Sequence, residues 1–530
     1  MAWQYGQAQQ RIRKLIDEAP EIDVRRFADE YMPLYEARKA VLKAANESVA
    51  PPLFDLQKGR AVVVDTVQIY IAITNYDDYR IEEGRETEAS HAKALRFLHL
   101  YYSTCDRVIE QTDAQRVDFH GSRMHAVVLN PDGDEGRHDS LLKALSFIRD
   151  FRVVADQANR ELAESDLDAV FRIGVDIGPC VAINNGNGLE QEPMFLGSSA
   201  NHAAKLAYGD EPGIFLSDRA RAVLDQPAVG PLETLVKLDE DVFRGIIDLR
   251  DEVTASSGVL RDPQVILKEW RDEITAKSVP DPTIPDFVFH YKEPPLNDIK
   301  FADLMPSSSI RMGLASLFAD LTGYTAYIDN AIAAGSIADA VKALYVVRQE
   351  LQNVVEDDFG GRKIRFIGDC IHGVVAEGSR TETEPNETVA ISLVCAGGLR
   401  SSFAICKAEL HGIGDLGLTI GIEFGPTPIT RIGIRGERSV RLASSIATAT
   451  SEKVQRGCDD DQIQLGPEAQ KLIPVALEDL IDANGTACDL THDDVITGLS
   501  LDTTVPAAPA YHRAHSPADT GVPRAHFTPR

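Results

Sequence analysis

The chain repeats itself once, and this repeat limits the folds that it can adopt. Four segments in the first half resemble four segments in the second half, in the same order. The offset between the two members of a pair stays between 247 and 249 residues. The matched segments are 73–79 and 321–327, 119–128 and 366–375, 172–179 and 419–426, and 214–220 and 463–469. Because nearly one offset accounts for all four pairs, the sequence predicts two copies of one domain.

Each copy has the pattern of an α/β unit. Apolar and polar residues alternate along 171–177 and 418–424, which is the period of a strand with one buried face. Short apolar runs follow Gly121 and Gly368, which predicts a strand, a tight turn and a returning strand in each copy. Helix-forming residues at helical spacing occupy two longer stretches, 88–111 and 335–356. We therefore expect an α+β sandwich in each copy, with helices covering one face of the sheet.

The repeat and the local composition divide the chain into five predicted segments. The N-terminal extension should be helical and pack across both copies, and the linker should combine a helix with a Pro-rich strap. From about residue 501 the chain is rich in Pro, Ala, Thr and His, which predicts a disordered tail. The segments are the extension 1–57, the first copy 58–228, the linker 229–310, the second copy 311–476 and the C-terminal segment 477–530.

Charge and composition exclude several functional classes. The chain has 54 Lys and Arg against 82 Asp and Glu, a formal net charge of −28, which argues against binding a nucleic acid polymer or an anionic membrane. No stretch approaches the ~18 apolar residues of a membrane-spanning helix, and the first residues have no apolar signal core. The seven cysteines are scattered and form no CxxC pair. We expect a cytoplasmic protein with reduced thiols and no zinc site.

Two aspartates in the second copy could hold metal ions. Asp320 ends an apolar run, and Asp369 lies at the predicted turn between two strands. If the two strands are neighbours, both carboxylates meet at one edge of the sheet and could share two Mg²⁺ or Mn²⁺ ions about 3.5–4 Å apart. A single Asp at a strand end is more often a turn or cap residue, so the pair in its repeat context carries the metal prediction. The turn that follows Asp320 would present backbone N–H groups to phosphate. It consists of Leu321, Thr322, Gly323, Tyr324 and Thr325.

Segments 318–325 and 365–375 resemble the two metal-site motifs of the class III nucleotide cyclases, and 172–205 resembles the later strand-and-helix region of that family. The resemblance implies βαββαβ-type catalytic domains that work in pairs, with the active site between two domains. It implies a 3′,5′-cyclic nucleotide and pyrophosphate as products. It also implies two Mn²⁺ or Mg²⁺ ions as cofactors, with Leu321 joining Asp320 and Asp369 in the metal site.

The first copy lacks the metal carboxylates but keeps other site residues. Ala72 and Ser122 stand at the positions of Asp320 and Asp369. Asn201 and Lys205, four residues apart, share one face of a helix. The resemblance implies that such an Asn orients the ribose and that the basic residue stabilises charge on the transferring phosphate. Lys stands where the family usually has Arg, which keeps the charge but not the planar fork.

The second copy should lack this Asn and basic pair. We predict its matching helix at 439–445, with Arg441 at the Asn position and Ser445 at the basic position. The chain would then form one active site, with metal from the second copy and Asn201 and Lys205 from the first, and a degenerate second pocket. The two copies would pair within one chain as a pseudo-heterodimer. The alternative for Asn201 and Lys205 is a solvated helix face.

The base-reading positions depart from those of purine cyclases. Family members that use ATP place Lys and Asp where this chain has Asp118 and Met194, and guanylate cyclases also differ there. Groups that face the wrong edge of a base cost about 1–3 kcal/mol each, so familiar ATP or GTP recognition is disfavoured. The departure resembles the pyrimidine cyclases of bacterial Pycsar anti-phage systems, which make cyclic UMP or cyclic CMP. Asp118 could accept from uracil N3–H or from the cytosine amino group.

These observations favour a cyclase that converts UTP to cyclic UMP. Cytidylate cyclase and an adenylate or guanylate cyclase with a rearranged pocket are the enzymatic alternatives. A catalytically inactive nucleotide sensor and a regulatory module for a partner protein are alternatives of other classes. We expect a monomer whose partners are the nucleoside triphosphate and, through the product, a separate effector protein, with no nucleic acid polymer and no membrane.

Overall fold

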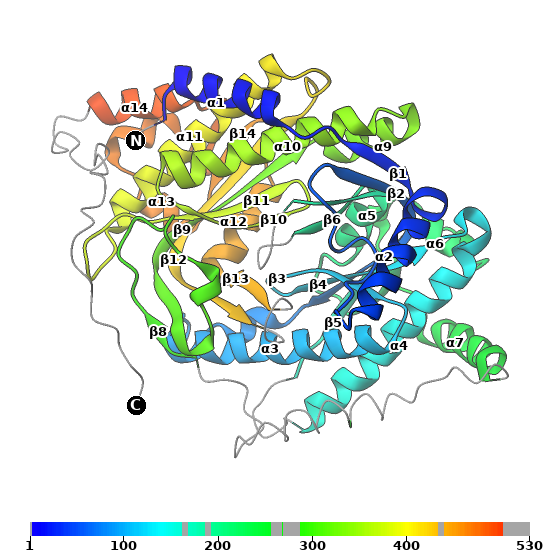
Figure 1. The fold of residues 1–530 in the computed structure, drawn as a ribbon. Helices are drawn as coiled ribbons and strands as arrows, with labels where there is room; N and C mark the ends of the chain where they lie inside the picture. Colours follow the sequence, from blue (N-terminus) through cyan, green and yellow to red (C-terminus); the bar gives the residue numbers. More distant parts are fainter. Residues whose placement is uncertain are drawn as a thin grey trace.

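The computed structural model describes residues 3–161, 168–185, 192–255, 268, 287–432 and 439–501, and Figure 1 shows its two β-sheets with their helices. The strands of the first sheet are β1 (Asp23–Arg26), β2 (Arg60–Ile73), β3 (Gln115–His120), β4 (Arg123–Asn130), β5 (Phe171–Asn184), β6 (Pro193–Leu196) and β7 (Gly213–Leu216). The strands of the second sheet are β8 (Phe289–His290), β9 (Ser309–Thr322), β10 (Arg362–Ile367), β11 (Cys370–Val375), β12 (Gly417–Ile432), β13 (Val440–Ala443), β14 (Gln462–Leu465) and β15 (Thr486–Cys488).

The described residues also form α-helices, some long and some short. They are α1 (Tyr5–Glu18), α2 (Met32–Ala44), α3 (Glu88–Gln111), α4 (Arg137–Glu161), α5 (Ser198–Leu206), α6 (Asp218–Val223), α7 (Glu240–Ala255), α9 (Tyr324–Ala334), α10 (Ile337–Asn353), α11 (Pro385–Glu409), α12 (Ile446–Arg456), α13 (Pro467–Lys471) and α14 (His492–Leu501). We call the described residues from β2 to α6 the first unit, and those from β9 to α13 the second unit.

The two units share one strand order, as the internal repeat leads one to expect. The order is β3-β4-β2-β5 in the first unit and β10-β11-β9-β12 in the second. In each unit the two long central strands run antiparallel, and Ala72 pairs with Arg172 as Asp320 pairs with Thr419. The predicted hairpins are β3–β4 and β10–β11, and the predicted long helices are α3 and α10. The structure therefore confirms the mixed α/β architecture and the local elements that the pattern predicted.

Helices cover both faces of each sheet, so the prediction of one covered face is wrong. Ile173 and Val175 of β5 lie in the apolar cluster that also contains residues of α3 and α4. Gly174, between them, faces α5 on the other side, where an added Cβ would lie 2.2 Å from the carbonyl oxygen of Ala203. Gly421 of β12 has the same relation to α12. A glycine in each strand thus lets a helix backbone lie directly on the sheet. The more polar face of the strand is therefore covered by this helix and is not exposed to solvent.

Strands of each unit pack into the apolar core of the other unit. The cluster around α10 and α11 of the second unit includes Ile183 and Met194 from β5 and β6 of the first. The cluster around α3 and α4 of the first unit includes Val440 and Leu442 from β13 of the second. Each apolar core is therefore completed by strands of the other unit, and burial of this apolar surface stabilises the contact.

The N-terminal segment contacts both units. β1 extends the first sheet by pairing in parallel with β2, a strand that the helical prediction for 1–57 missed. α1 lies along α10 and α11 beside the second sheet (Figure 1). Arg11 of α1 forms an ion pair with Glu350 at 2.7 Å, and the Trp3 indole donates to Ser402 at 2.8 Å.

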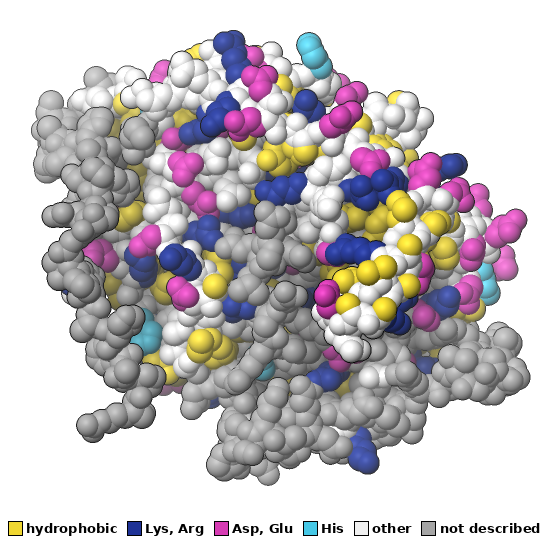
Figure 2. Space-filling view, viewed as in Figure 1, with side chains coloured by type: hydrophobic (Ala, Val, Ile, Leu, Met, Phe, Trp, Pro, Cys, Tyr) yellow, Lys and Arg dark blue, Asp and Glu magenta, His cyan; other side chains and the backbone are white. Residues whose placement is uncertain are grey.

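Helix α11 is longer and more apolar than any helix expected from the sequence. By length and composition it could span a membrane, against the prediction that no stretch approaches this. However, 83% of its most apolar window is buried inside the protein, which is the pattern of a core helix. On the face shown in Figure 2, basic and acidic side chains are interspersed. The predicted Pro-rich strap before residue 287 and the tail beyond 501 lie outside the described residues.

Candidate active site

A cavity of about 760 Å³ lies between the two units and collects most of the predicted site residues. The second unit contributes both aspartates and most of the turn that follows β9, and the first unit contributes the Asn and Lys of α5. The predicted residues that line it are Asp320, Leu321, Gly323, Tyr324, Thr325, Asp369, Asn201 and Lys205. Thr322, at the end of β9, is not among the lining residues.

The two carboxylates lie on neighbouring strands. β11 pairs with β9 through Ile371 and Ala319, so Asp369 in the β10–β11 turn reaches the same edge as Asp320. Burial raises the pKa of Asp320 to about 6. Burial, and then the charge of Asp320, raise the pKa of Asp369 well above its usual value. Two partly buried carboxylates that repel each other are a site that a cation would stabilise.

The turn after β9 provides a helix N-terminus at the cavity. Gly323 has a left-handed backbone, with φ of 75°, which glycine adopts without strain. Helix α9 then begins at Tyr324, and its first residues line the cavity. The unpaired N–H groups of this first turn, together with the helix dipole, favour a negatively charged ligand there.

Helix α5 of the first unit docks on α9 of the second. The amide of Asn201 donates to Thr325 Oγ1 at 2.6 Å, and the Ser198 N–H donates to Asp329 at 3.0 Å. Lys205, one turn after Asn201, is exposed within the cavity, and its charge acts to lower the pKa of Asp369 against the larger effect of burial. Asn201 and Lys205 therefore lie on the same cavity as the carboxylate pair.

The prediction for the matching helix of the second copy is wrong. Arg441 lies in strand β13, and Ser445 caps α12 by accepting from the Thr448 N–H at 3.1 Å. The matching helix is α12, because an added Cβ at Gly421 would lie 2.1 Å from the Ser451 carbonyl, as Gly174 relates to Ala203. The error arose because a strand precedes each helix, and local similarity aligned the strand of one copy with the helix of the other. With the glycines aligned, Ala449 matches Asn201 and Lys453 matches Lys205.

Asp118 and Met194, the predicted base-reading residues, do not line this cavity. Asp118 forms an ion pair with Arg365 at 2.6 Å, and Arg365 stands at the corresponding position of the second unit. Burial raises and Arg365 lowers the pKa of Asp118, with lowering the net result. Met194 is 5% exposed and packs in the apolar cluster of the second unit.

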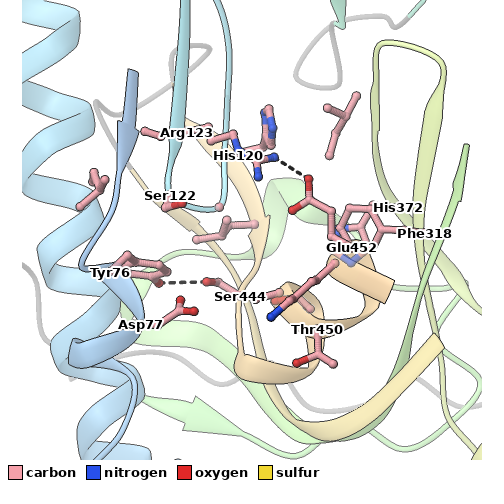
Figure 3. Close-up of a pocket in the computed structure, with 18 of the residues that line it drawn as sticks. Tyr76, Asp77, His120, Ser122, Arg123, Phe318, His372, Ser444, Thr450 and Glu452 are labelled. Carbon is pink, nitrogen blue, oxygen red and sulfur yellow. Dashed lines mark hydrogen bonds and ion pairs between the residues drawn. The ribbon is translucent and has the colours of Figure 1, made fainter. Parts of the chain in front are cut away.

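A second cavity of about 430 Å³ occupies the corresponding place on the other side. Figure 3 shows this cavity between the units. The Tyr76 hydroxyl and Ser444 Oγ are hydrogen-bonded there at 2.9 Å. It has no carboxylate at the two metal positions, where Ala72 and Ser122 line it, and it has Ala449 at the Asn position. Its lining matches the degenerate pocket that the sequence predicts, except that it keeps a basic residue, Lys453.

The sequence reading missed several residues of the larger cavity. Among them are two arginines, a glutamate and two tyrosines that no family motif marks. These residues are Arg123, Glu452, Arg456, Tyr70 and Tyr208. Glu452 and Arg456 share the four-residue helical spacing of Asn201 and Lys205, and this would have been visible once α12 was aligned with α5.

Known proteins resemble this chain over most of its length, although no family model matches it. The chain is 41% identical to a uridylate cyclase of a Rhizobium species over 494 residues, which cover 92% of this chain and 94% of that protein. It is 33% identical to a uridylate cyclase of Pseudomonas aeruginosa, with 86% of each chain covered.

Among solved structures, the crystal structure of a class III adenylyl cyclase-like ATP-binding protein from Pseudomonas aeruginosa matches with a TM-score of 0.82 and 29% identity. The match covers 94% of this chain and 100% of that chain, so it includes both sheets. With two relatives above 30% identity over most of its length, the chain belongs to the class III nucleotidyl cyclases, in the family of these uridylate cyclases.

Proposed function

We propose that the protein converts UTP to 3′,5′-cyclic UMP and pyrophosphate at the cavity between its two units. The observation that carries this proposal is the composition of that cavity. It joins the carboxylates of Asp320 and Asp369 with the Asn201 and Lys205 side chains of the other unit. The two relatives named uridylate cyclase support uridine as the base.

The donor set fits a pair of divalent cations. Within the described residues no group of three or more His, Cys, Asp or Glu side chains is arranged to hold a metal. Mg²⁺ and Mn²⁺ do not require such a group, because Mg²⁺ commonly binds through one or two carboxylates plus waters and substrate phosphates. Burial raises the pKa of both Asp320 and Asp369, and bound cations would offset this by favouring the ionised carboxylates. Bound there, with Leu321 beside them, two ions would acidify the ribose 3′-hydroxyl and neutralise the triphosphate.

The chain's own residues position the substrate for ring closure. The N-terminus of α9 binds phosphate oxygens, and Asn201, fixed by its bond to Thr325, orients the ribose. In the reaction the 3′-oxygen forms a bond to the α-phosphorus and its proton leaves to solvent. The bond from the α-phosphorus to the bridging oxygen breaks, and its electron pair stays on pyrophosphate. Lys205 stabilises the charge that builds on the transferring phosphate.

The two units act as an intramolecular pair in this proposal, so one chain holds one complete site. Strands of each unit pack into the apolar core of the other, and helix α5 contacts α9. Both observations support this pairing. The seven cysteines are free thiols, which supports a reducing compartment such as the cytoplasm. The product would act as a second messenger on a separate effector in anti-phage defence, which the family resemblance to Pycsar cyclases supports.

A second candidate is an ATP-binding function, because the similar solved structure is described as ATP-binding. The deciding experiment incubates the purified protein with Mn²⁺ and each of the four ribonucleoside triphosphates separately, and identifies the products by mass spectrometry. Cyclic UMP as the main product supports the proposal. Cyclic AMP, GMP or CMP as the main product would keep the cyclase but overturn the uridylate assignment. Absence of every product would favour the nucleotide sensor.

A further inference from the structure

Three charged side chains form a cluster where the two cavities meet. Glu452 Oε1 accepts from Arg123 Nη1 at 2.5 Å and from Arg456 Nη2 at 2.5 Å. Arg123 belongs to β4 of the first unit, and Glu452 and Arg456 lie one turn apart on α12 of the second. Figure 3 shows Arg123 and Glu452 reaching toward each other from the two units. All three line the larger cavity together with Asp320 and Asp369.

The cluster has no charged counterpart in the repeat. The residues at the corresponding positions of the other unit are uncharged, so the fold of a unit does not require charges at these three positions. This ion cluster is only partly buried, with Arg456 exposed, and ion pairs of this kind contribute little to stability by themselves. The counterparts of Arg123, Glu452 and Arg456 are Cys370, Ala204 and Tyr208.

The cluster offers one further acceptor beside two cations. Both hydrogen bonds that Glu452 accepts within the described residues end on Oε1, which leaves Oε2 for a third donor. Burial raises the pKa of Glu452, but the charges of Arg123 and Arg456 hold it at about 2, so the carboxylate is ionised at neutral pH. Arg456 is fixed on its other side by the ring of Tyr208, 4.7 Å from the guanidinium.

The cavity also contains flat apolar surface near this cluster. The ring of Tyr70 stacks on His125 with 4.0 Å between centroids, and Phe318 stacks on His372 at 4.2 Å. Tyr70, Phe318 and Ile367 all line the cavity. A nucleobase needs such apolar surface for its faces and polar groups for its edge.

The cluster offers two donors and one acceptor, the set of groups that the uracil edge requires. Uracil presents a carbonyl, the N3–H and a second carbonyl along one edge, which requires a donor, an acceptor and a donor opposite. Cytosine and adenine present a bare ring nitrogen at the central position, which a carboxylate repels. Asp118, the other carboxylate considered for this task, is held by Arg365 away from the cavity lining.

We propose that Glu452 accepts the N3–H of uracil through Oε2, while Arg123 and Arg456, which both bond to Oε1, donate to the uracil carbonyls. The cluster is then the base-reading element of the active site, in place of the family positions at Asp118 and Met194. This inference rests on the proposed cyclase function at the same cavity. Guanine also offers a ring N–H, so the cluster rejects cytosine and adenine more strongly than guanine.

The test is a change of specificity in Glu452→Gln. The amide has nearly the same size, but its Nε2 can donate to the bare N3 of cytosine. We expect the ratio of kcat/KM for UTP over CTP to fall roughly 10- to 100-fold, the effect of one mismatched buried hydrogen bond. The change should fall mainly on KM, because base contacts form in the ground state as well as the transition state. A merely structural role would lower activity with both nucleotides equally.

Two further variants and one binding measurement complete the experiment. Asp118→Asn should leave the UTP to CTP ratio within about twofold of wild type, since small changes of this size fall below one hydrogen bond. Arg244→Met, at an exposed ion pair on α7, controls for loss of an arginine far from the cavity. Calorimetric binding of UMP and CMP should show the same loss of preference in Glu452→Gln without any turnover.

The outcomes separate the failure of this inference from failure of the proposed function. A wild type that makes cyclic UMP, with an unchanged nucleotide ratio in Glu452→Gln, overturns the base-reading role and keeps the cyclase. A ratio that changes in Asp118→Asn instead returns the role to Asp118. A wild type that prefers CTP or ATP, or that binds CMP as well as UMP, also overturns it. If no product forms, but the wild type prefers UMP and Glu452→Gln loses that preference, the cyclase proposal is overturned while the cluster is supported as a uracil site.

Discussion

At the scale of single residues, Asp320 is the group on which the proposed chemistry depends most. Burial beside Asp369 raises the pKa of its carboxylate, so a cation bound there would favour the ionised form. Asp320→Asn keeps the size and removes the ligand charge. We expect cyclase activity to fall more than about 10²-fold, as when one strong transition-state contact is lost. Product formation measured by mass spectrometry, with circular dichroism to verify folding, checks this. A folded variant with activity near wild type would refute the metal site.

His125 is a residue whose buried neutral state should make stability depend on pH. It is 4% exposed, stacks on Tyr70 and bonds to Gln68 at 2.7 Å. Burial lowers its pKa from 6.5 to about 3, with Asp118 opposing and His120 adding to the shift. Because the unfolded chain binds the proton more readily, this stability is present above pH 6.5 and is lost as pH falls toward 3.

The corresponding experiment compares urea unfolding of wild type and His125→Gln at pH 7 and pH 5. The wild type should lose about 2 kcal/mol more than the variant over this interval, from about one proton bound per unfolded chain between roughly pH 6.5 and 5. His372 occupies the corresponding place in the second unit, with its pKa also lowered to about 3 by burial, and His372→Gln should behave alike. Equal pH dependence in wild type and variants would contradict the assignment.

At the scale of elements, the position of α5 depends on Gly174. An added Cβ there would lie 2.2 Å from the Ala203 carbonyl oxygen and 2.6 Å from the Ala207 nitrogen, and backbone cannot move aside as a side chain can. Gly174→Ala should therefore shift α5, with Asn201 and Lys205 on it, and destabilise the protein by about 1–3 kcal/mol. Melting temperature and kcat should both fall. Gly245→Ala, at a helix position where no described residue lies within 4 Å of an added Cβ, is the matched control and should lower neither the melting temperature nor kcat.

The elements that the sequence predicted well are those with local signals. The alternation along β5 and β12 and the glycine turns of the two hairpins are visible within about ten residues, the range of a local pattern. The second covered face was missed because Gly174 and Asp176 read as a solvated strand face, whereas α5 buries them. Asp320 and Asp369 were singled out because each lies at a predicted strand end or turn, and the structure places both on the larger cavity.

The parts of the site that were missed depend on contacts between distant residues. Asp118 looked free to read a base, but its partner Arg365 lies in the other unit. The Glu452 cluster joins α12 to Arg123 of β4, and no local pattern marks that contact. Arg441 was placed on a helix because similar short segments precede each helix, and only the strand register resolves them.

At the scale of the whole molecule, the N-terminal segment ties the two units together. Its strand β1 extends the first sheet, and its helix α1 forms ion pairs with the second unit through Arg11 and Arg13. Glu350, the partner of Arg11, is fully buried, so this bond is shielded from solvent. A segment that binds both units reduces the entropy cost of their association. This favours pairing within one chain over pairing between chains.

Pairing within one chain makes a prediction about mixtures of inactive variants. Asp320→Asn damages the second-unit half of the site, and Lys205→Met damages the first-unit half. If each chain completes its own site, a mixture of the two variants stays as inactive as either alone. If sites formed between chains, some pairs would join an intact Asp320 to an intact Lys205, and activity would return. We expect no recovery on mixing and a wild-type specific activity that does not change with protein concentration, both measured by product formation. Recovery on mixing would place the active site between two chains.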